Sequence, residues 1–341
     1  MLRRIVGTAQ HYSWGDSTSI PDMFGLPRGE GTWAEMWFGT HHMAPSRLDD
    51  VDGPLMSEVT GEMEMLVKIL AAGRPLSLQT HPTREQAERG AAREDAAGVP
   101  VDAPQRMYRD RSDKPEVLIA LTDFEALCGF QDDAGITATF TRLGWHAELD
   151  VFTSRGLGAY LRWCFEQSAP PDVSSAPRWL TDVARLHPND PGLRVAPLLH
   201  HVVLRPGQAL CLPAGNLHAY LHGCGLEIMN SSDNVVRAGF TDKHIDPEEL
   251  LSILDTSPLH DPVNEPSADG LYPSPSPAFT VQRITAEHRT AFPAEASHRV
   301  VFGPFAPGSP GHKPAMHLLV AGESGELECH DGGWLWICRQ G

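Results

Sequence analysis

Short apolar runs separated by turn residues dominate the N-terminal part of the chain and predict a sheet. The runs 65–70 (MLVKIL), 117–121 (VLIAL) and 124–130 (FEALCGF) have the length and composition of buried strands. The run 76–81 (LSLQTH) alternates instead, so an extended backbone turns its polar side chains to one face and its leucines to the other. The polar residues on the shared face are Ser77, Gln79 and His81.

The hydrophobic period changes to that of a helix beyond residue 133. Segments 137–143, 156–167 and 177–186 carry helical periodicity, and we interpret the region 133–195 as a helical insertion between strands. The sequence therefore predicts a sheet that is interrupted once by helices.

Strand patterns return after the insertion, in the stretch 199–243. Asp246 followed by Pro247 is typical of a helix start, with a cap and a proline at the first position. A proline-rich connector over 256–278 then leads to weak strand alternation between 279 and 338. The two β-rich halves on either side of the connector are consistent with a structural duplication.

Charge and cysteine usage narrow the possible partners. A formal net charge of −17 over 341 residues disfavours nucleic acid and anionic membranes as partners, although a local Lys and Arg cluster could still bind an anionic small molecule. The six cysteines show no C-x-x-C spacing and several lie in apolar runs, which favours buried thiols over a disulfide framework. No run approaches the length of a membrane span. We therefore expect a cytoplasmic protein with no membrane partner.

Two charged residues inside apolar strands each have two interpretations. Lys68 in MLVKIL is typical of an edge strand with its ammonium in water, and less typical of a charge that points into a polar cavity. Glu35, beside two aromatic residues in AEMWFG, is more typical of a surface or structural position than of a site.

Four residues offer the side chains of a metal site: Gln79, His81, Glu116 and His218. Two imidazoles and a carboxylate are a usual set for Zn²⁺ or another divalent first-row metal, and a glutamine oxygen is a neutral fourth ligand. Lys114 lies two residues before Glu116, so an extended backbone places both on one face. The alternative is that both histidines are ordinary strand-end or loop residues.

The longest motifs resemble those of type I mannose-6-phosphate isomerases, also called type I phosphomannose isomerases. They are LVKILAAGRPLSLQTHP, DKPEVLIALTDFEALCGF and LPAGNLHAYLHGCGLEIMNSSDNVVRAG, with QHYSWG and AEMWFGTHHMAPS before them. The resemblance implies a mainly β fold of two cupin-type jelly-roll barrels with an inserted α-helical region. It implies a catalytic cupin domain over 1–132 and 196–258, the helical insertion over 133–195, and a second cupin-like barrel over 259–341.

The resemblance also implies roles for individual residues. The ligands of one Zn²⁺ per chain fall on Gln79, His81, Glu116 and His218. The substrate-binding residues fall on Trp14, Ser77, Lys114, Tyr220 and Lys243, with Ser77 and Lys114 at the phosphate end. The catalytic residues fall on Arg237, which would stabilise negative charge, and on Glu227 or alternatively Lys68, which would move the proton. The residues alone leave a structural alternative for three of these roles. Arg237 could form an ion pair with Asp233 in a loop, Tyr220 could pack inside the barrel, and Lys243 could be solvated.

The implied activity is the interconversion of mannose 6-phosphate and fructose 6-phosphate through a cis-enediol, by a monomer in carbohydrate metabolism and GDP-mannose biosynthesis. Three features depart from the family: Ser112-Asp113 replaces Asn-His, the loop THHMAPS replaces a proline-and-glycine version, and the chain stops at HDGGWLWICRQG. The last departure predicts a shortened second barrel or a truncated chain. Two other functions remain open, a cupin that binds metal and senses sugar phosphates, and an isomerase of a different sugar phosphate.

Overall fold

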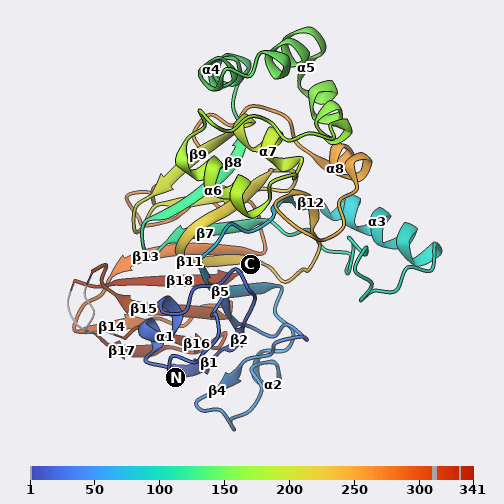
Figure 1. Ribbon diagram of the computed structural model, residues 1–341. Helices are drawn as coiled ribbons and strands as arrows, with labels where there is room; N and C mark the ends of the chain where they lie inside the picture. The colour runs from blue at the N-terminus through green and yellow to red at the C-terminus, as the bar shows by residue number, and fades with distance from the viewer. Residues whose placement is uncertain (1, 309–312, 330–331) are drawn as a thin grey trace.

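Two large antiparallel sheets share one apolar core and carry most of the chain (Figure 1). The structure, a computed structural model, describes residues 2–308, 313–329 and 332–341. The ten-stranded sheet consists of β2 (Thr8–Gln10), β3 (Glu35–Phe38), β5 (Met65–Ala72), β6 (Leu78–Thr80), β7 (Glu116–Ala120), β8 (Phe124–Phe130), β9 (Leu199–Leu204), β10 (Ala209–Leu212), β11 (His218–Asn230) and β12 (Val236–Gly239). The predicted mainly β fold is confirmed.

The second sheet combines both ends of the chain. Its six strands are β1 (Arg3–Val6), β4 (Arg47–Leu48), β13 (Phe279–Thr285), β15 (Arg299–Phe305), β16 (Ala315–Leu319) and β18 (Trp334–Gln340), and β14 (Arg289–Phe292) and β17 (Gly325–Glu328) form a separate pair. β1 pairs with β16, so a strand from the first residues lies beside one that follows the connector. Ile5 of β1 and Val281 of β13 are buried in the shared core.

The helices are divided between two regions of Figure 1: α3 to α8 lie in its upper half, with α4 and α5 at the top, whereas α1 and α2 lie near the bottom. They are α1 (Ser19–Phe24), α2 (Ser57–Thr60), α3 (Arg84–Ala96), α4 (Asp133–Leu143), α5 (His146–Glu166), α6 (Arg178–Leu186), α7 (Gly192–Val195) and α8 (Pro247–Ile253), with a 3₁₀ turn at Ala196–Leu198. The helices expected between 133 and 195 are present. α4 begins before the predicted residue 137 because the Asp132 carboxylate accepts the Gly135 N–H and caps the helix.

β11 is the strand that joins the two halves of the ten-stranded sheet. Its first residues pair with β6 and β8, whereas residues 223–230 pair with β5 and β7. The change of partners begins at Gly223, where φ is 121° and a Cβ would lie 2.6 Å from the Asp123 carbonyl oxygen. Only glycine fits such a position without strain. The register of β11 against β8 also shifts between Tyr220 and His222. Side chains from both halves of β11 meet, because the Tyr220 hydroxyl contacts Glu227.

The edge position expected for Lys68 is wrong, and the structure decides between the positions left open for Glu35 and His218. β5 pairs with both β3 and β11, so Lys68 lies inside the sheet and is only 5 % exposed rather than on an edge. Glu35 on β3 is buried as well, which excludes the surface position of its two and leaves the structural one. His218 is the first residue of β11, so it lies at a strand end and not in a loop. In each case the local pattern could not show which strands lie on either side.

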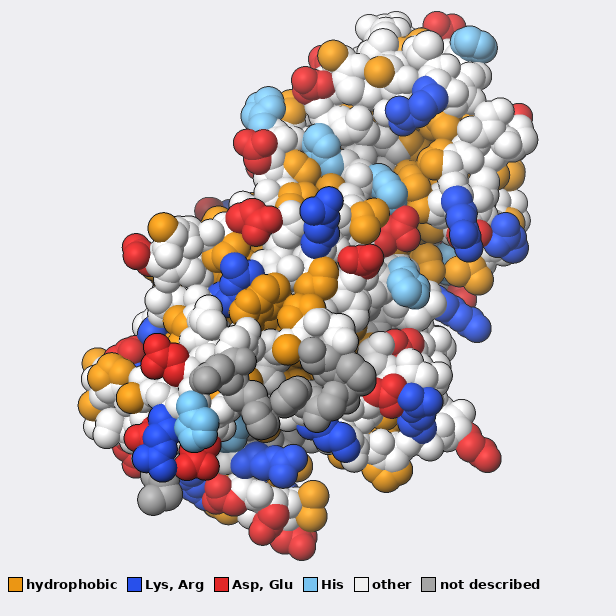
Figure 2. Space-filling model, turned by 90° about the vertical axis from the view of Figure 1, so that its left-hand side faces the viewer, with side chains coloured by type: hydrophobic (Ala, Val, Ile, Leu, Met, Phe, Trp, Pro, Cys, Tyr) orange, Lys and Arg blue, Asp and Glu red, His pale blue; other side chains and the backbone are white. Residues whose placement is uncertain are grey.

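On the face shown in Figure 2, acidic and basic side chains are interspersed and apolar side chains lie in small groups. Within the described residues, no helix has both the length and the apolar character that crossing a bilayer requires.

Candidate metal centre and catalytic cavity

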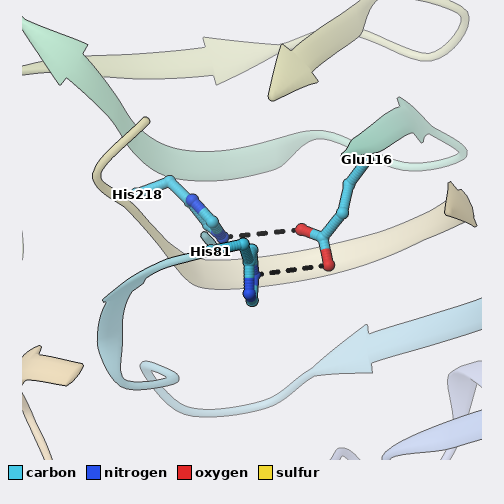
Figure 3. A group of neighbouring side chains, drawn as sticks. All are labelled: His81, Glu116 and His218. Atoms are coloured by element: carbon cyan, nitrogen blue, oxygen red, sulfur yellow. Dashed lines mark ion pairs between the residues drawn. The ribbon is translucent and has the colours of Figure 1, made fainter. Parts of the chain in front are cut away.

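Three of the four predicted ligands converge on one buried point (Figure 3). His81 directly follows β6, Glu116 begins β7 and His218 begins β11. The Nε2 atoms of His81 and His218 each lie 3.5 Å from a different carboxylate oxygen of Glu116. All three residues are at most 2 % exposed. Residues far apart in the sequence thus form one compact donor set.

Backbone carbonyls orient both imidazoles toward this point. Nδ1 of His81 donates to the carbonyl of Asn234 at 2.6 Å, and Nδ1 of His218 donates to the carbonyl of Asn216 at 3.1 Å. These contacts assign the Nδ1–H tautomer, so each Nε2 presents a lone pair to the carboxylate.

Three buried atoms of the cluster lack hydrogen-bond partners among the described residues: His81 Nε2, His218 Nε2 and Glu116 Oε2. Leaving a buried polar atom unpaired costs about 1–3 kcal/mol, so such atoms normally have a partner. Each of these three atoms carries a lone pair and can only accept a hydrogen bond, and the three atoms face one another. A divalent cation bound between them would satisfy all three at once, and the donor set therefore fits a metal ion.

The charge states of the cluster suit a cation. Burial and the nearby Lys114 ammonium hold the pKa of His81 well below its usual value, and burial lowers the pKa of His218, so both rings are neutral near pH 7. Burial alone would raise the pKa of Glu116, but Lys114 at 2.9 Å and the two imidazoles hold that pKa below its usual range. Neutral imidazole and ionised carboxylate are the forms that bind metals.

Gln79, the fourth predicted ligand, lies beside the cluster. It is opposite His218 on one side and opposite Arg237 of β12 on the other, and opposite residues of paired strands share a face. Its Oε1 accepts a hydrogen bond from Ser77 Oγ at 2.8 Å. The alternation of 76–81 thus correctly indicated that Ser77 and Gln79 act on the same side, and ligation by Gln79 stays a prediction.

A row of buried charges lies on β3, β5 and β11. Lys68 Nζ is 3.4 Å from Glu35 Oε1 and 3.6 Å from Glu227 Oε2. Tyr220 donates from its hydroxyl to Glu227 Oε1 at 3.0 Å, while Trp37 Nε1 donates to Glu35 Oε2 at 2.7 Å. The local sequence gives no signal that Glu35 belongs to the site, and only the pairing of β3 with β5 brings it there.

The charges in this row give Lys68 and Glu227, the two candidates for proton transfer, different protonation states at neutral pH. Burial would lower the pKa of Lys68, but the carboxylates of Glu35 and Glu227 outweigh it and raise that pKa. Burial, reinforced by the charge of Glu116 and opposed by Lys68, raises the pKa of Glu227 to about 7. Lys68 therefore stays protonated at neutral pH, whereas Glu227 can take up and release a proton there.

A cavity of about 540 Å³ opens next to Gln79. Its walls include three predicted substrate-binding residues, Trp14, Ser77 and Lys243, and the predicted catalytic residue Arg237. Lys114 is not among the lining residues and instead contacts Glu116. The structure therefore divides the predicted substrate residues between the cavity and the cluster.

Two cations of the cavity wall lack an acidic partner. In the described parts of the chain no ion pair involves Arg237 or Lys243, and Asp233 instead contacts His41 Nε2 at 3.4 Å. The alternative of an Arg237–Asp233 ion pair is therefore wrong. Burial, then the charge of Arg109, lowers the pKa of Arg237, and burial followed by Arg237 and Arg109 lowers that of Lys243.

Arg109 and His41 were not singled out from the sequence. Arg109 lies among several basic residues in RMYRDRSDK, and His41 among the two histidines of THHMAPS, so no local signal distinguished either residue. Their relevance comes from folding, which brings Arg109 near the cavity cations and His41 against Asp233.

Comparison with known proteins identifies the family. Residues 2–133 match the family model described as the catalytic domain of phosphomannose isomerase type I. The mannose-6-phosphate isomerase of Escherichia coli is 32% identical over 289 residues, which cover 74% of each chain. The Salmonella typhimurium mannose-6-phosphate isomerase is 33% identical over 289 residues with the same coverage. The chain belongs to the type I phosphomannose isomerases.

Solved structures extend the likeness over the whole fold. A zinc-bound holo structure of mannose 6-phosphate isomerase superposes with a TM-score of 0.83 at 26% identity and covers 99% of both chains. The Salmonella typhimurium mannose 6-phosphate isomerase bound to substrate (f6p) and a metal atom (zn) gives a TM-score of 0.81 at 26% identity, again over 99% of both chains.

Proposed function

We propose that the protein is a zinc-dependent aldose-ketose isomerase that interconverts D-mannose 6-phosphate and D-fructose 6-phosphate. The observation that carries this proposal is the buried His81–Glu116–His218 cluster, whose unpartnered atoms fit one divalent cation. Solved relatives of the same fold that are bound to zinc and to f6p support the choice of metal and substrate.

One zinc ion per chain would be held by His81, Glu116, His218 and Gln79. The carbonyl oxygen of Gln79 has two lone pairs, so the hydrogen bond from Ser77 leaves one of them for the metal. When bound, zinc supplies Lewis acidity that polarises substrate oxygens and stabilises negative charge. The ligand histidines themselves stay neutral, and their Nδ1–H groups remain hydrogen-bonded to carbonyls.

Glu227 is the proposed base. Its carboxylate takes the proton from C2 of the open-chain aldose, the C2–H electron pair forms the C1–C2 double bond, and the π pair of the C1 carbonyl moves onto O1. A proton then passes from O2 to O1, the C2 carbonyl forms, and the C1–C2 π pair takes the proton back from Glu227 at C1 to give the ketose. A pKa of about 7 suits both directions at neutral pH. Lys68 stays charged and holds Glu227 in place, and Arg237 would stabilise the negative charge on the enediolate oxygens.

The phosphate of the substrate would bind at the cationic wall of the cavity. Ser77, Lys243 and Lys114 are its proposed ligands, and the single hydroxyl proton of Ser77 would turn from Gln79 to the phosphate when substrate binds. The absence of any acidic partner for Lys243 among the described residues supports its role. The ammonium of Lys114 has three donors, so it can serve the phosphate and Glu116 together. Trp14 would form a side wall for the sugar, and Tyr220 would keep the carboxylate of Glu227 oriented.

We also propose the finer architecture. The two sheets would form cupin-type jelly-roll barrels, with a catalytic domain over 1–132 and 196–258, the helical insertion over 133–195 and a second barrel over 259–341. A cytoplasmic monomer is proposed as well. The cytoplasmic location is supported by the six cysteines, which are all free, as expected in a reducing compartment. Light scattering of the purified protein would test the oligomeric state.

A metal-dependence assay tests the proposed function. Purified protein is assayed for fructose 6-phosphate formation from mannose 6-phosphate, before and after chelation, and again after zinc is returned. We expect turnover that is lost on chelation and restored by zinc. Turnover that survives complete metal removal would exclude the zinc mechanism. Zinc-loaded protein that binds mannose 6-phosphate without turning it over would favour a sensor, and turnover of another sugar phosphate instead would change the substrate.

A further inference from the structure

Asn234, in the turn between β11 and β12, is fully buried and uses its whole side-chain amide. Its Oδ1 accepts the backbone N–H groups of Arg109 at 2.7 Å and Asp110 at 3.1 Å. Its Nδ2 lies 3.0 Å from both the carbonyl and the Oδ1 of Asp110, and 2.8 Å from the carbonyl of Ser112. One side chain therefore fixes the backbone of the segment 109–112.

Asp110, which belongs to the segment 109–112, binds in turn to the segment 232–234 that contains Asn234. Its carboxylate accepts hydrogen bonds from Ser232 Oγ at 2.9 Å and from the Asp233 N–H at 2.8 Å, as well as from the Ser112 N–H at 2.8 Å. Hydrogen bonds to an ionised acceptor are stronger than those between neutral groups. Segment 232–234 is thus bound to segment 109–112 through side chains at both ends of the contact.

This contact reaches the metal centre through one atom. The backbone carbonyl of Asn234 is the acceptor that orients His81, at 2.6 Å from Nδ1. Groups that hold the second nitrogen of a ligand histidine set its ring orientation and its basicity. Displacing the carbonyl would turn the His81 ring away from Glu116 and His218.

We propose that Asp110 and Asn234 are positioning residues for the metal centre, which hold the Asn234 carbonyl where it aims His81 at the ion. They touch no reacting atom, and their contact with the ligand set runs through the Asn234 carbonyl to His81. The inference rests on the zinc site of the proposed function and extends it to residues outside the ligand set.

The chain offers a matched control in Asn230, at the end of β11. Asn230 is buried like Asn234, its Nδ2 donates to Asp113 Oδ1 at 3.0 Å, and its Oδ1 accepts from Ser276 Oγ at 3.0 Å. Asn234→Asp and Asn230→Asp therefore each set a new carboxylate opposite an existing aspartate. Only Asn234→Asp lies at the residue whose carbonyl holds His81. General destabilisation should therefore affect both variants, whereas misorientation of the His81 ring should affect Asn234→Asp alone.

The test is the zinc dissociation constant, measured by competition with a chromophoric chelator, together with the unfolding midpoint of each metal-free variant. We expect Asn234→Asp to weaken zinc binding about 10–100-fold, the usual effect of removing such a partner, and Asn230→Asp to stay within about threefold. At saturating zinc, kcat of Asn234→Asp should return to within about threefold of the unchanged enzyme.

Unchanged zinc affinity in folded Asn234→Asp would overturn the proposal, as would equal losses in both variants. If Asn234→Asp does not fold, Asp110→Asn carries the test, and unchanged zinc affinity there has the same meaning. The dissociation constant needs no turnover. An unchanged protein that binds zinc but does not isomerise would therefore defeat the proposed function and leave the positioning role standing.

Discussion

Replacing Lys68 by methionine removes the ammonium that lies between Glu35 and Glu227 while keeping a side chain of similar length. Lys68 Nζ is 3.6 Å from the nearer oxygen of Glu227. At an effective dielectric constant of about 20, a charge pair at this distance is worth about 4 to 5 kcal/mol. Without it, Glu227 holds its proton more tightly, so its pKa must rise above the present value of about 7.

The consequence is a change in the pH profile. A base is active above its pKa, so kcat/KM of the zinc-loaded enzyme should fall as the pH drops through about 7. In Lys68→Met the fall should move to higher pH, and since 1.36 kcal/mol corresponds to a factor of ten, activity at pH 7 should drop about a thousandfold. Part of the lost activity of Lys68→Met should return at alkaline pH.

The assay is kcat/KM for mannose 6-phosphate across the pH range, with zinc content measured in parallel. Lys68→Arg, which keeps the charge, is the control and should retain the position of the acid limb. A Lys68→Met enzyme whose acid limb stays at its original pH would refute the assignment of Glu227 as the base. So would a loss of activity that is the same at every pH.

Three further outcomes are expected. Glu227→Gln keeps an acceptor for the Tyr220 hydroxyl but cannot take a proton, so kcat should fall by about a thousandfold or more with one zinc still bound; substantial turnover would exclude Glu227 as base. Lys243→Ala should raise KM for mannose 6-phosphate about 10–100-fold with little change in kcat, and an unchanged KM would remove Lys243 from the phosphate site. Gly223→Ala should lower the free energy of unfolding by about 2–4 kcal/mol in urea titrations, because its Cβ would meet the Asp123 carbonyl, and an unaltered midpoint would contradict the close approach of the backbone at Gly223.

Local sequence patterns predicted the parts of the site that lie on one strand. Alternation in 76–81 placed Ser77 and Gln79 on a shared face, and the cap at Asp246 and the strand beginning near Glu116 are present in the structure. These features depend on backbone geometry over a few residues, which the sequence encodes directly.

The convergence of distant strands could not be predicted in this way. Lys68 was expected at an edge because an isolated lysine in an apolar strand is costly to bury, yet β3 and β11 supply two carboxylates that offset the cost. Neither partner is near Lys68 in sequence. The same holds for His81 and His218, whose meeting depends on the pairing of β6 with β11 and entered the sequence analysis through family resemblance.

Anomalous scattering tests the central claim most directly. Crystals of the zinc-loaded protein are measured on both sides of the zinc absorption edge. We expect one peak per chain between His81 Nε2, His218 Nε2 and the Glu116 carboxylate, about 2.0–2.1 Å from each imidazole nitrogen. An active preparation whose zinc peak lies elsewhere, or that shows no peak at these three side chains, would contradict the account.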